Sequence, residues 1–125
     1  ADPPPVDDPS ITDDQILWRR VHPEQVVLDR NLNQKRPTSQ AFNNSSGTSG
    51  MSVDIADETT VQDTLKGYPD HLLVEFEAGL VRQLNQGVIR DPLPDNPAHA
   101  EVTGKKRKPV QRSLYTNCRW VVDPN

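Results

Sequence analysis

The chain has no apolar run near the roughly 20 residues that a membrane-spanning helix needs, and its N-terminus lacks the basic start and apolar centre of a signal peptide. We therefore expect a soluble protein; whether a signal was removed before Ala1 stays open. The single cysteine, Cys118, excludes an internal disulfide. A chain without disulfides suits a reducing compartment, so a cytoplasmic location is expected.

Apolar residues are scarce as well. Hydrophobic residues make up 33% of the 125 residues, and adding the six glycines leaves the total below the roughly 45–50% typical of globular domains. This composition predicts one domain with a small core. The formal charge of −4 argues against general affinity for nucleic acids or anionic membranes, because both select a basic surface. Any basic site must be local.

Specific motifs are absent too. No segment has the signature of a phosphate-binding loop, a zinc knuckle or a catalytic motif. The three histidines and the cysteine are widely spaced without a short-range ligand pair, so no metal site is expected. Cys118 follows Val110 and Leu114 at helical spacing, which predicts a buried small hydrophobic residue.

The first fifteen residues contain four prolines and five aspartates, with Val6 and Ile11 as the only large aliphatic side chains. Such a segment buries little apolar surface to offset the entropy of ordering it. We therefore expect residues 1–15 to form a disordered acidic tail. Docking of this segment on a basic partner or on its own domain is the alternative.

Residues 16–125 are expected to form a single α+β domain. Runs of β-branched and alternating apolar residues predict strands, and helical spacing with glycine stops predicts helices. The predicted strands span 16–21, 25–28, 51–56, 72–77, 88–90, 98–103 and 119–122, and the predicted helices 58–66, 80–86 and 110–118. We expect a mixed or antiparallel sheet of about five or six short strands with two or three short helices. The pattern does not fix the strand order.

Residues 43–50 read Asn-Asn-Ser-Ser-Gly-Thr-Ser-Gly. They are too polar and too rich in turn formers for a strand or a stable helix. A flexible polar loop is predicted here, and it is a candidate surface for binding a partner. Whether it orders on binding stays open.

Acidic and imidazole groups form a first candidate site. If Phe76 and its alternating neighbours face the core, Glu75 and Glu77 share the opposite face of their strand, and His99 with Glu101 could line a neighbouring strand. Carboxylates beside an imidazole suit general acid–base chemistry or a metal. The alternative is a solvated sheet face, since alternating charge is usual on an exposed strand surface.

A second set follows the order arginine, serine, Glu-x-Glu. It comprises Arg19 or Arg20, then Ser39 within Thr-Ser, then Glu75-Phe-Glu77. This order resembles the ADP-ribosyltransferases. The resemblance implies NAD as the cofactor-like substrate, with Arg20 and Ser39 near NAD and Glu77 as the catalytic residue. Together with the first set it defines an alternative function, a nucleotide- or NAD-using enzyme acting through Arg20, Ser39, Glu75, Glu77 and His99. Without that activity no cofactor is expected.

A broader likeness covers most of residues 16–123. The segments Leu-Trp-Arg-Arg-Val-His-Pro, Arg-Pro-Thr-Ser-Gln-Ala-Phe, Met-Ser-Val-Asp, Asn-Pro-Ala-His-Ala-Glu-Val-Thr-Gly-Lys-Lys and Arg-Trp-Val-Val occur in this order. This order is similar to that of small bacterial proteins of unknown function. The likeness implies a bacterial origin and a self-standing domain, but no activity.

The third candidate site is a basic turn before the last predicted helix. It reads Gly-Lys-Lys-Arg-Lys and comprises Lys105, Lys106, Arg107 and Lys108, with Arg112 one helical turn further on. Cations beside the N–H groups of a helix start suit a carboxylate or phosphate. The alternative is a solvated turn. The sequence thus favours an accessory or interaction domain that binds a protein or small anionic partner through this turn and the 43–50 loop. The oligomeric state stays open.

Overall fold

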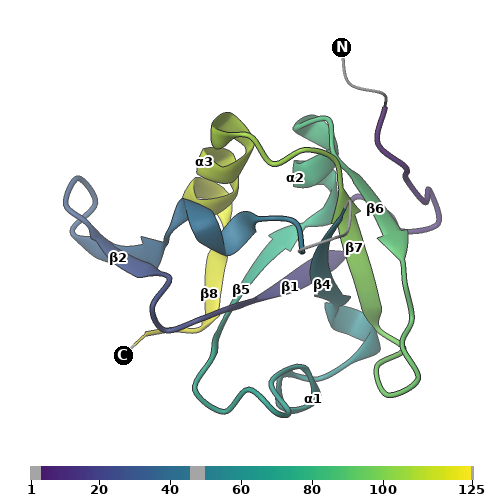
Figure 1. Ribbon diagram of the computed structural model, residues 1–125, viewed down its shortest axis with the longest axis horizontal. Coiled ribbons are helices and arrows are strands. Elements are labelled where there is room, and N and C mark those ends of the chain that lie inside the picture. The colour runs from purple at the N-terminus through teal and green to yellow at the C-terminus, as the bar shows by residue number, and fades with distance from the viewer. Residues whose placement is uncertain (1–3, 46–49, 125) are drawn as a thin grey trace.

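The computed structural model describes residues 4–45 and 50–124, and its main layer is an antiparallel sheet of six strands in the order β6-β7-β4-β1-β5-β8. Strands β2 and β3 form a separate hairpin that projects to one side (Figure 1). The strands are β1 (Ile16–Val21), β2 (Val26–Asp29), β3 (Gln34–Pro37), β4 (Gly50–Ile55), β5 (Leu72–Glu77), β6 (Gly87–Arg90), β7 (His99–Thr103) and β8 (Arg119–Val122).

Short helices cover both faces of the sheet. They are α1 (Val61–Thr64), α2 (Ala78–Gln83) and α3 (Lys108–Asn117), with 3-10 turns η1 (Ser39–Phe42) and η2 (Ala56–Glu58). Figure 1 shows α2 and α3 on one side of the sheet and α1 on the other. The predicted single α+β domain is confirmed. No helix in the described part of the chain is long and apolar enough to cross a membrane.

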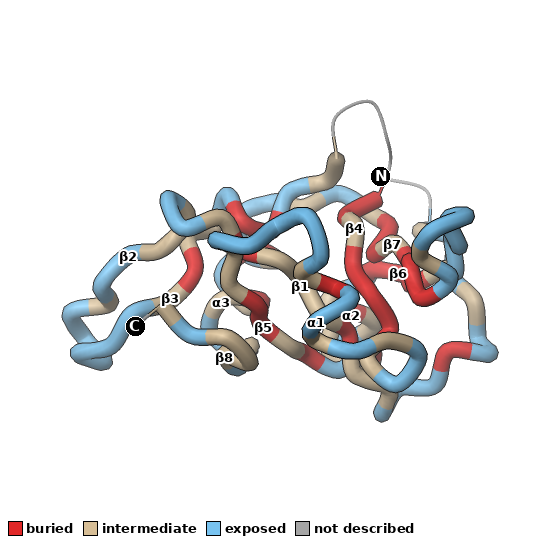
Figure 2. Tube along the Cα trace, turned by 90° about the horizontal axis from the view of Figure 1, so that it is seen from below, coloured by how far each residue is buried: buried red, intermediate tan, exposed pale blue. Residues whose placement is uncertain are grey.

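The core lies between the sheet and the α2–α3 layer. Strand alternation points Leu17 of β1 and Phe76 of β5 to this side, and Phe42 of η1 packs edge-on against Phe76 with ring centroids 6.4 Å apart. Figure 2 shows buried residues along β4 and its neighbours, whereas the β2–β3 hairpin is mostly exposed. Of the predicted flexible loop 43–50, residues 46–49 lie outside the described residues.

The helix expected over 58–66 is shorter than predicted. Thr60 is extended, with φ −126° and ψ 162°, and separates η2 from α1. A buried polar cluster fixes α1 to the sheet: the Asp54 carboxylate accepts hydrogen bonds of 2.9 Å from the Thr64 hydroxyl and of 2.9 Å from the Asn96 amide. Both carboxylate oxygens are therefore occupied, which gives Asp54 a structural role.

The N-terminal arm, residues 4–15, packs on the domain, so the expectation of a disordered tail is wrong for its described part. Ile11 is fully buried in the core. At the β6 edge, the Asp8 N–H donates to the Val88 carbonyl at 2.7 Å, and the Val88 N–H donates to the Asp7 carboxylate at 2.8 Å. The arm therefore covers a strand edge that would otherwise expose unpaired backbone groups.

Arg82 of α2 supplies the electrostatic part of this docking. Its guanidinium pairs with Asp7 at 3.1 Å and with Asp13 at 2.7 Å, and it donates to the Asp8 carbonyl at 3.0 Å. The aspartates that suggested a solvated tail thus surround one cation of the domain. One apolar anchor, one arginine and the hydrogen bonds to β6 together hold this segment of low hydrophobicity on the domain.

Candidate functional site

Three of the five residues of the enzyme alternative share the α1 face of the sheet. In β1 and β5, Trp18 opposes Glu75 and Ile16 opposes Glu77, so strand alternation places both glutamates on the same face as Arg20. Arg20 donates to the Thr64 carbonyl at 3.1 Å, and its Cζ lies 4.1 Å from the Tyr68 ring centroid. These contacts hold the Arg20 guanidinium at the attachment of α1.

Ser39 and His99 lie elsewhere. Ser39 belongs to η1, whose Phe42 packs on the opposite face of the sheet. His99 is in β7, and β4 and β1 separate it from β5, a distance of about 14 Å at the usual strand spacing. The His99 Nδ1 lies 2.7 Å from the Asp91 carbonyl oxygen, and the residue is only 8% exposed. The five residues therefore do not converge on one pocket, as an active site requires.

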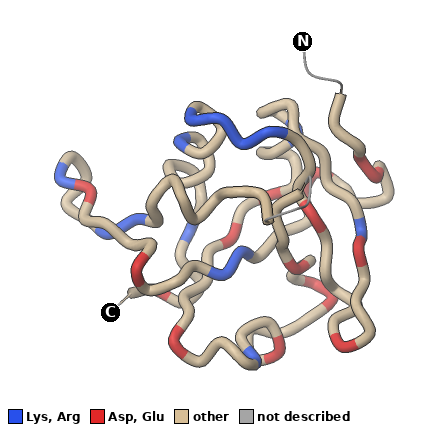
Figure 3. Tube along the Cα trace, in the orientation of Figure 1, with Lys and Arg blue, Asp and Glu red and all other residues tan. Residues whose placement is uncertain are grey.

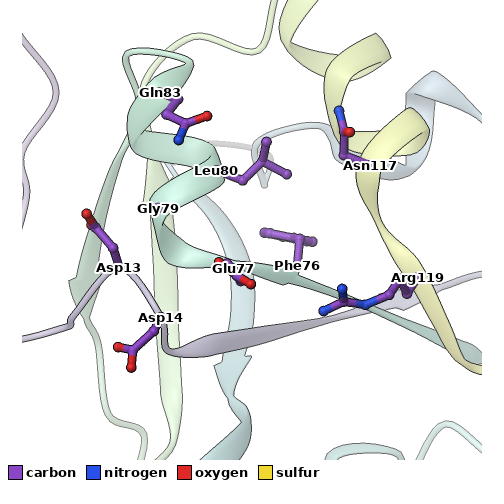
Figure 4. Close-up of a pocket in the computed structure, with 9 residues that line it drawn as sticks. All are labelled: Asp13, Asp14, Phe76, Glu77, Gly79, Leu80, Gln83, Asn117 and Arg119. Atoms are coloured by element: carbon purple, nitrogen blue, oxygen red, sulfur yellow. The ribbon is translucent and has the colours of Figure 1, made fainter.

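Glu77 lines a cleft of about 390 Å³ between the arm, α2 and the α3–β8 junction (Figure 4). In Figure 4, Leu80 extends from α2 toward α3, and Arg119 reaches in from β8. Two of its charged groups have ion-pair partners: Arg119 pairs with Glu75 at 3.1 Å, and Asp13 pairs with Arg82. The residues described around this cleft include no serine, threonine, cysteine, histidine or lysine, so their ionisable groups are the carboxylates of Asp13, Asp14 and Glu77 and the guanidinium of Arg119.

Metal ligation is also unsupported in the described part of the chain. Residues 4–45 and 50–124 contain no group of three or more His, Cys, Asp or Glu side chains that could hold an ion. Cys118 is half-buried, and burial raises the pKa of its thiol to about 11. A thiol with that pKa is a poor metal ligand and a poor nucleophile at neutral pH.

The basic turn has a conformation that fits its position between β7 and α3. Gly104 has φ +114°, and a side chain there would meet the Gln86 amide at 2.8 Å. Glycine therefore allows the sharp turn that brings the following cations to the start of α3. Figure 3 shows basic residues running through this turn into the helix.

Four cations of this region form what we call the basic surface: Lys105, Arg107, Lys108 and Arg112. All four are exposed. They surround the N-terminus of a ten-residue helix whose first turn contains no acidic residue. The positive end of the helix and the side-chain charges therefore add, and together they attract an anionic group.

Lys106, which the sequence placed in the same site, turns inward. Its Nζ donates to the Val102 carbonyl at 2.9 Å and to the Gly104 carbonyl at 2.8 Å. Burial, together with the like charge of Arg19, lowers the pKa of Lys106 to about 8. Lys106 therefore stabilises the turn instead of contributing to the basic surface.

This burial predicts a pH dependence. Between pH 8 and 9 the domain should become more stable by about 0.5 kcal/mol, allowing for solvent screening of the half-buried amine. The cause is that the unfolded chain, in which the lysine pKa is 10.5, binds more protons in this window than the folded chain, in which it is about 8. Denaturant unfolding of Lys106→Met should show no such rise. The window ends at pH 9, around which the unfolded Cys118 thiol, with a pKa of 9.0, loses its proton while the folded thiol, with a pKa of about 11, keeps it. This difference lowers the stability as the pH rises. Equal pH profiles for wild type and variant would contradict this role for Lys106.

Arg19, the alternative to Arg20 in the ADP-ribosyltransferase-like order, is an inward-facing cation. Its guanidinium donates to the Ala41 carbonyl at 3.0 Å and to the Ser52 carbonyl at 2.8 Å, so it ties η1 to β4. Burial lowers its pKa to about 10. The sequence indicates this position, because Arg19 alternates with Leu17 and Val21 and therefore lies on the core face of β1.

Comparisons with protein-family models, curated proteins and solved structures return no match.

Proposed function

We propose that this chain is a small interaction domain that binds an acidic protein partner through the basic surface. The observation that carries the proposal is the clustering of four exposed cations around the start of α3 on a domain whose formal charge is −4. A local basic site on an acidic molecule discriminates among partners by charge and orients them. The proposal needs no cofactor.

Asn44, in the described part of the 43–50 segment, lies next to the basic surface. The Asn44 side-chain amide donates to the Gly104 carbonyl at 3.0 Å, so the start of the segment contacts the basic turn. This contact supports the expectation that the turn and the loop face the same partner. A binding module can leave its polar groups on an open surface, whereas a catalytic site needs its polar groups in one concave pocket.

The experiment is a fluorescence anisotropy titration with labelled hexaglutamate, a minimal acidic segment. Wild type should bind the peptide, and the affinity should fall as salt is raised, because exposed charges are screened. The variant with Lys105→Glu, Arg107→Glu and Lys108→Glu should not bind. Equal affinity of the two proteins would contradict the proposal.

A further inference from the structure

A groove of about 580 Å³ lies beside the basic surface, between the N-terminal arm, the end of α2 and the start of α3. Its volume is within the range of sites that hold a small ligand or a short peptide segment. Two of its residues, Lys105 and Arg107, belong to the basic surface. Its apolar lining includes Leu84 beyond α2 and Val110 of α3, and Pro4 and Pro5 of the arm. The groove is therefore cationic along one part and apolar along another.

The arm wall of this groove is held in place by specific contacts. The Thr103 hydroxyl donates to the Val6 carbonyl, directly after the two prolines. A side chain at Gly87 would meet that carbonyl at 2.0 Å, so the close approach of arm and β6 requires glycine. The pairing of Asp7 with Arg82 fixes the next residue. The prolines are thus positioned by the domain.

A buried amide in the groove lining adds a hydrogen-bonding group. Gln86 is only 7% exposed, and its Nε2 donates to the Lys105 carbonyl at 3.0 Å. Its Oε1 has no hydrogen-bond partner within the described residues. This oxygen is itself buried, so it gains a partner only if the groove lining shifts to admit an N–H donor.

Building on the proposed function, we infer that the arm and the basic turn together form a composite groove for an extended peptide segment that combines acidic and apolar side chains. The carboxylates face Lys105 and Arg107, and the apolar side chains contact Leu84, Val110 and the two prolines. Side chains alternate along an extended segment, so one segment can present both kinds of group.

Other anionic ligands fit this lining less well. Inorganic phosphate would leave the apolar part of the groove uncovered. A single-stranded nucleic acid gains much of its affinity from stacking on aromatic rings, and the described residues of this groove include none. Charge and apolar area together therefore favour the peptide.

The test compares three labelled hexamers on the full chain: alternating glutamate–leucine, hexaglutamate and oligothymidine. We expect the alternating peptide to bind at least about tenfold more tightly than hexaglutamate despite its fewer charges, because it buries apolar surface. Tighter binding of hexaglutamate or of oligothymidine would overturn the inference.

Two variants in the arm distinguish peptide binding in a groove from peptide binding to a charged surface alone. Pro4→Ser with Pro5→Ser changes no charge, and it should weaken the alternating peptide about fivefold while leaving hexaglutamate unchanged. Asp7→Ala removes the negative charge together with the acceptor of the Val88 N–H, so electrostatics alone predicts tighter binding, whereas loss of the arm wall predicts weaker binding. Val6→Ser is the matched control, since Val6 is 67% exposed.

The two proposals fail in different ways. Unchanged binding of the alternating peptide by the double proline variant, or tighter binding by Asp7→Ala, overturns the groove and leaves the basic surface standing. Failure of every acidic peptide to bind wild type overturns both.

Discussion

Replacing Ile11 by alanine should lower the free energy of unfolding by about 2–4 kcal/mol. Ile11 is fully buried and belongs to the main hydrophobic core, although it lies in a proline- and aspartate-rich segment. Truncation removes its apolar contacts and leaves a cavity. Because Ile11 anchors the arm, the change should also loosen the contacts of Asp7 and Asp8 with β6.

Urea unfolding followed by tryptophan fluorescence measures this loss. Val6→Ala is the control in the same arm, and because Val6 is 67% exposed it should change the free energy by less than about 0.5 kcal/mol. Equal stability of Ile11→Ala and wild type would show that the arm contributes nothing to the core.

Reversing three charges of the basic surface should weaken an acidic peptide at least about 100-fold. In the variant with Lys105→Glu, Arg107→Glu and Lys108→Glu, the start of α3 repels the carboxylates that it attracts in the wild type. The three side chains are exposed, so the folded domain should remain intact. Lys106 is left unchanged because its amine hydrogen-bonds within the turn.

A matched reversal distinguishes a local site from net charge. Arg30, Lys35 and Lys66 are exposed and do not belong to the basic surface, so changing all three to glutamate alters the charge of the protein equally. This control should bind the peptide with less than about a threefold loss, because charges beyond a Debye length are largely screened. Comparable losses in both variants would assign the binding to net charge.

The strands with strong apolar character were predictable. Residues 16–21, 72–77 and 119–122 form β1, β5 and β8 with the predicted bounds. By contrast, β3 reads Gln-Lys-Arg-Pro, which is a poor strand pattern on its own. Pairing with the neighbouring strand β2 and a 3.1 Å hydrogen bond from the Trp120 indole to the Lys35 carbonyl hold it, and the second of these interactions is distant in sequence.

The order of the strands explains why the predicted site residues do not lie together. The alternation that put Glu75 and Glu77 on one face is present, but two strands separate β5 from β7 and His99. No local pattern encodes that separation. The basic turn was visible in the sequence because its residues are contiguous. The inward direction of Lys106 was not, since it depends on where the Val102 carbonyl lies.

The arm shows the limit of composition as a guide to order. Its many aspartates indicate disorder when counted alone, yet Arg82 lies far along the chain and pairs with two of them. Composition could not reveal that these charges meet a cation.

An NMR titration of the ¹⁵N-labelled domain with unlabelled hexaglutamate tests the central claim most directly. The largest amide shift changes should fall at Gly104 to Arg112, with smaller ones at Asn44. Shift changes centred on β5 or on the β2–β3 hairpin, or no changes at millimolar peptide, would contradict it.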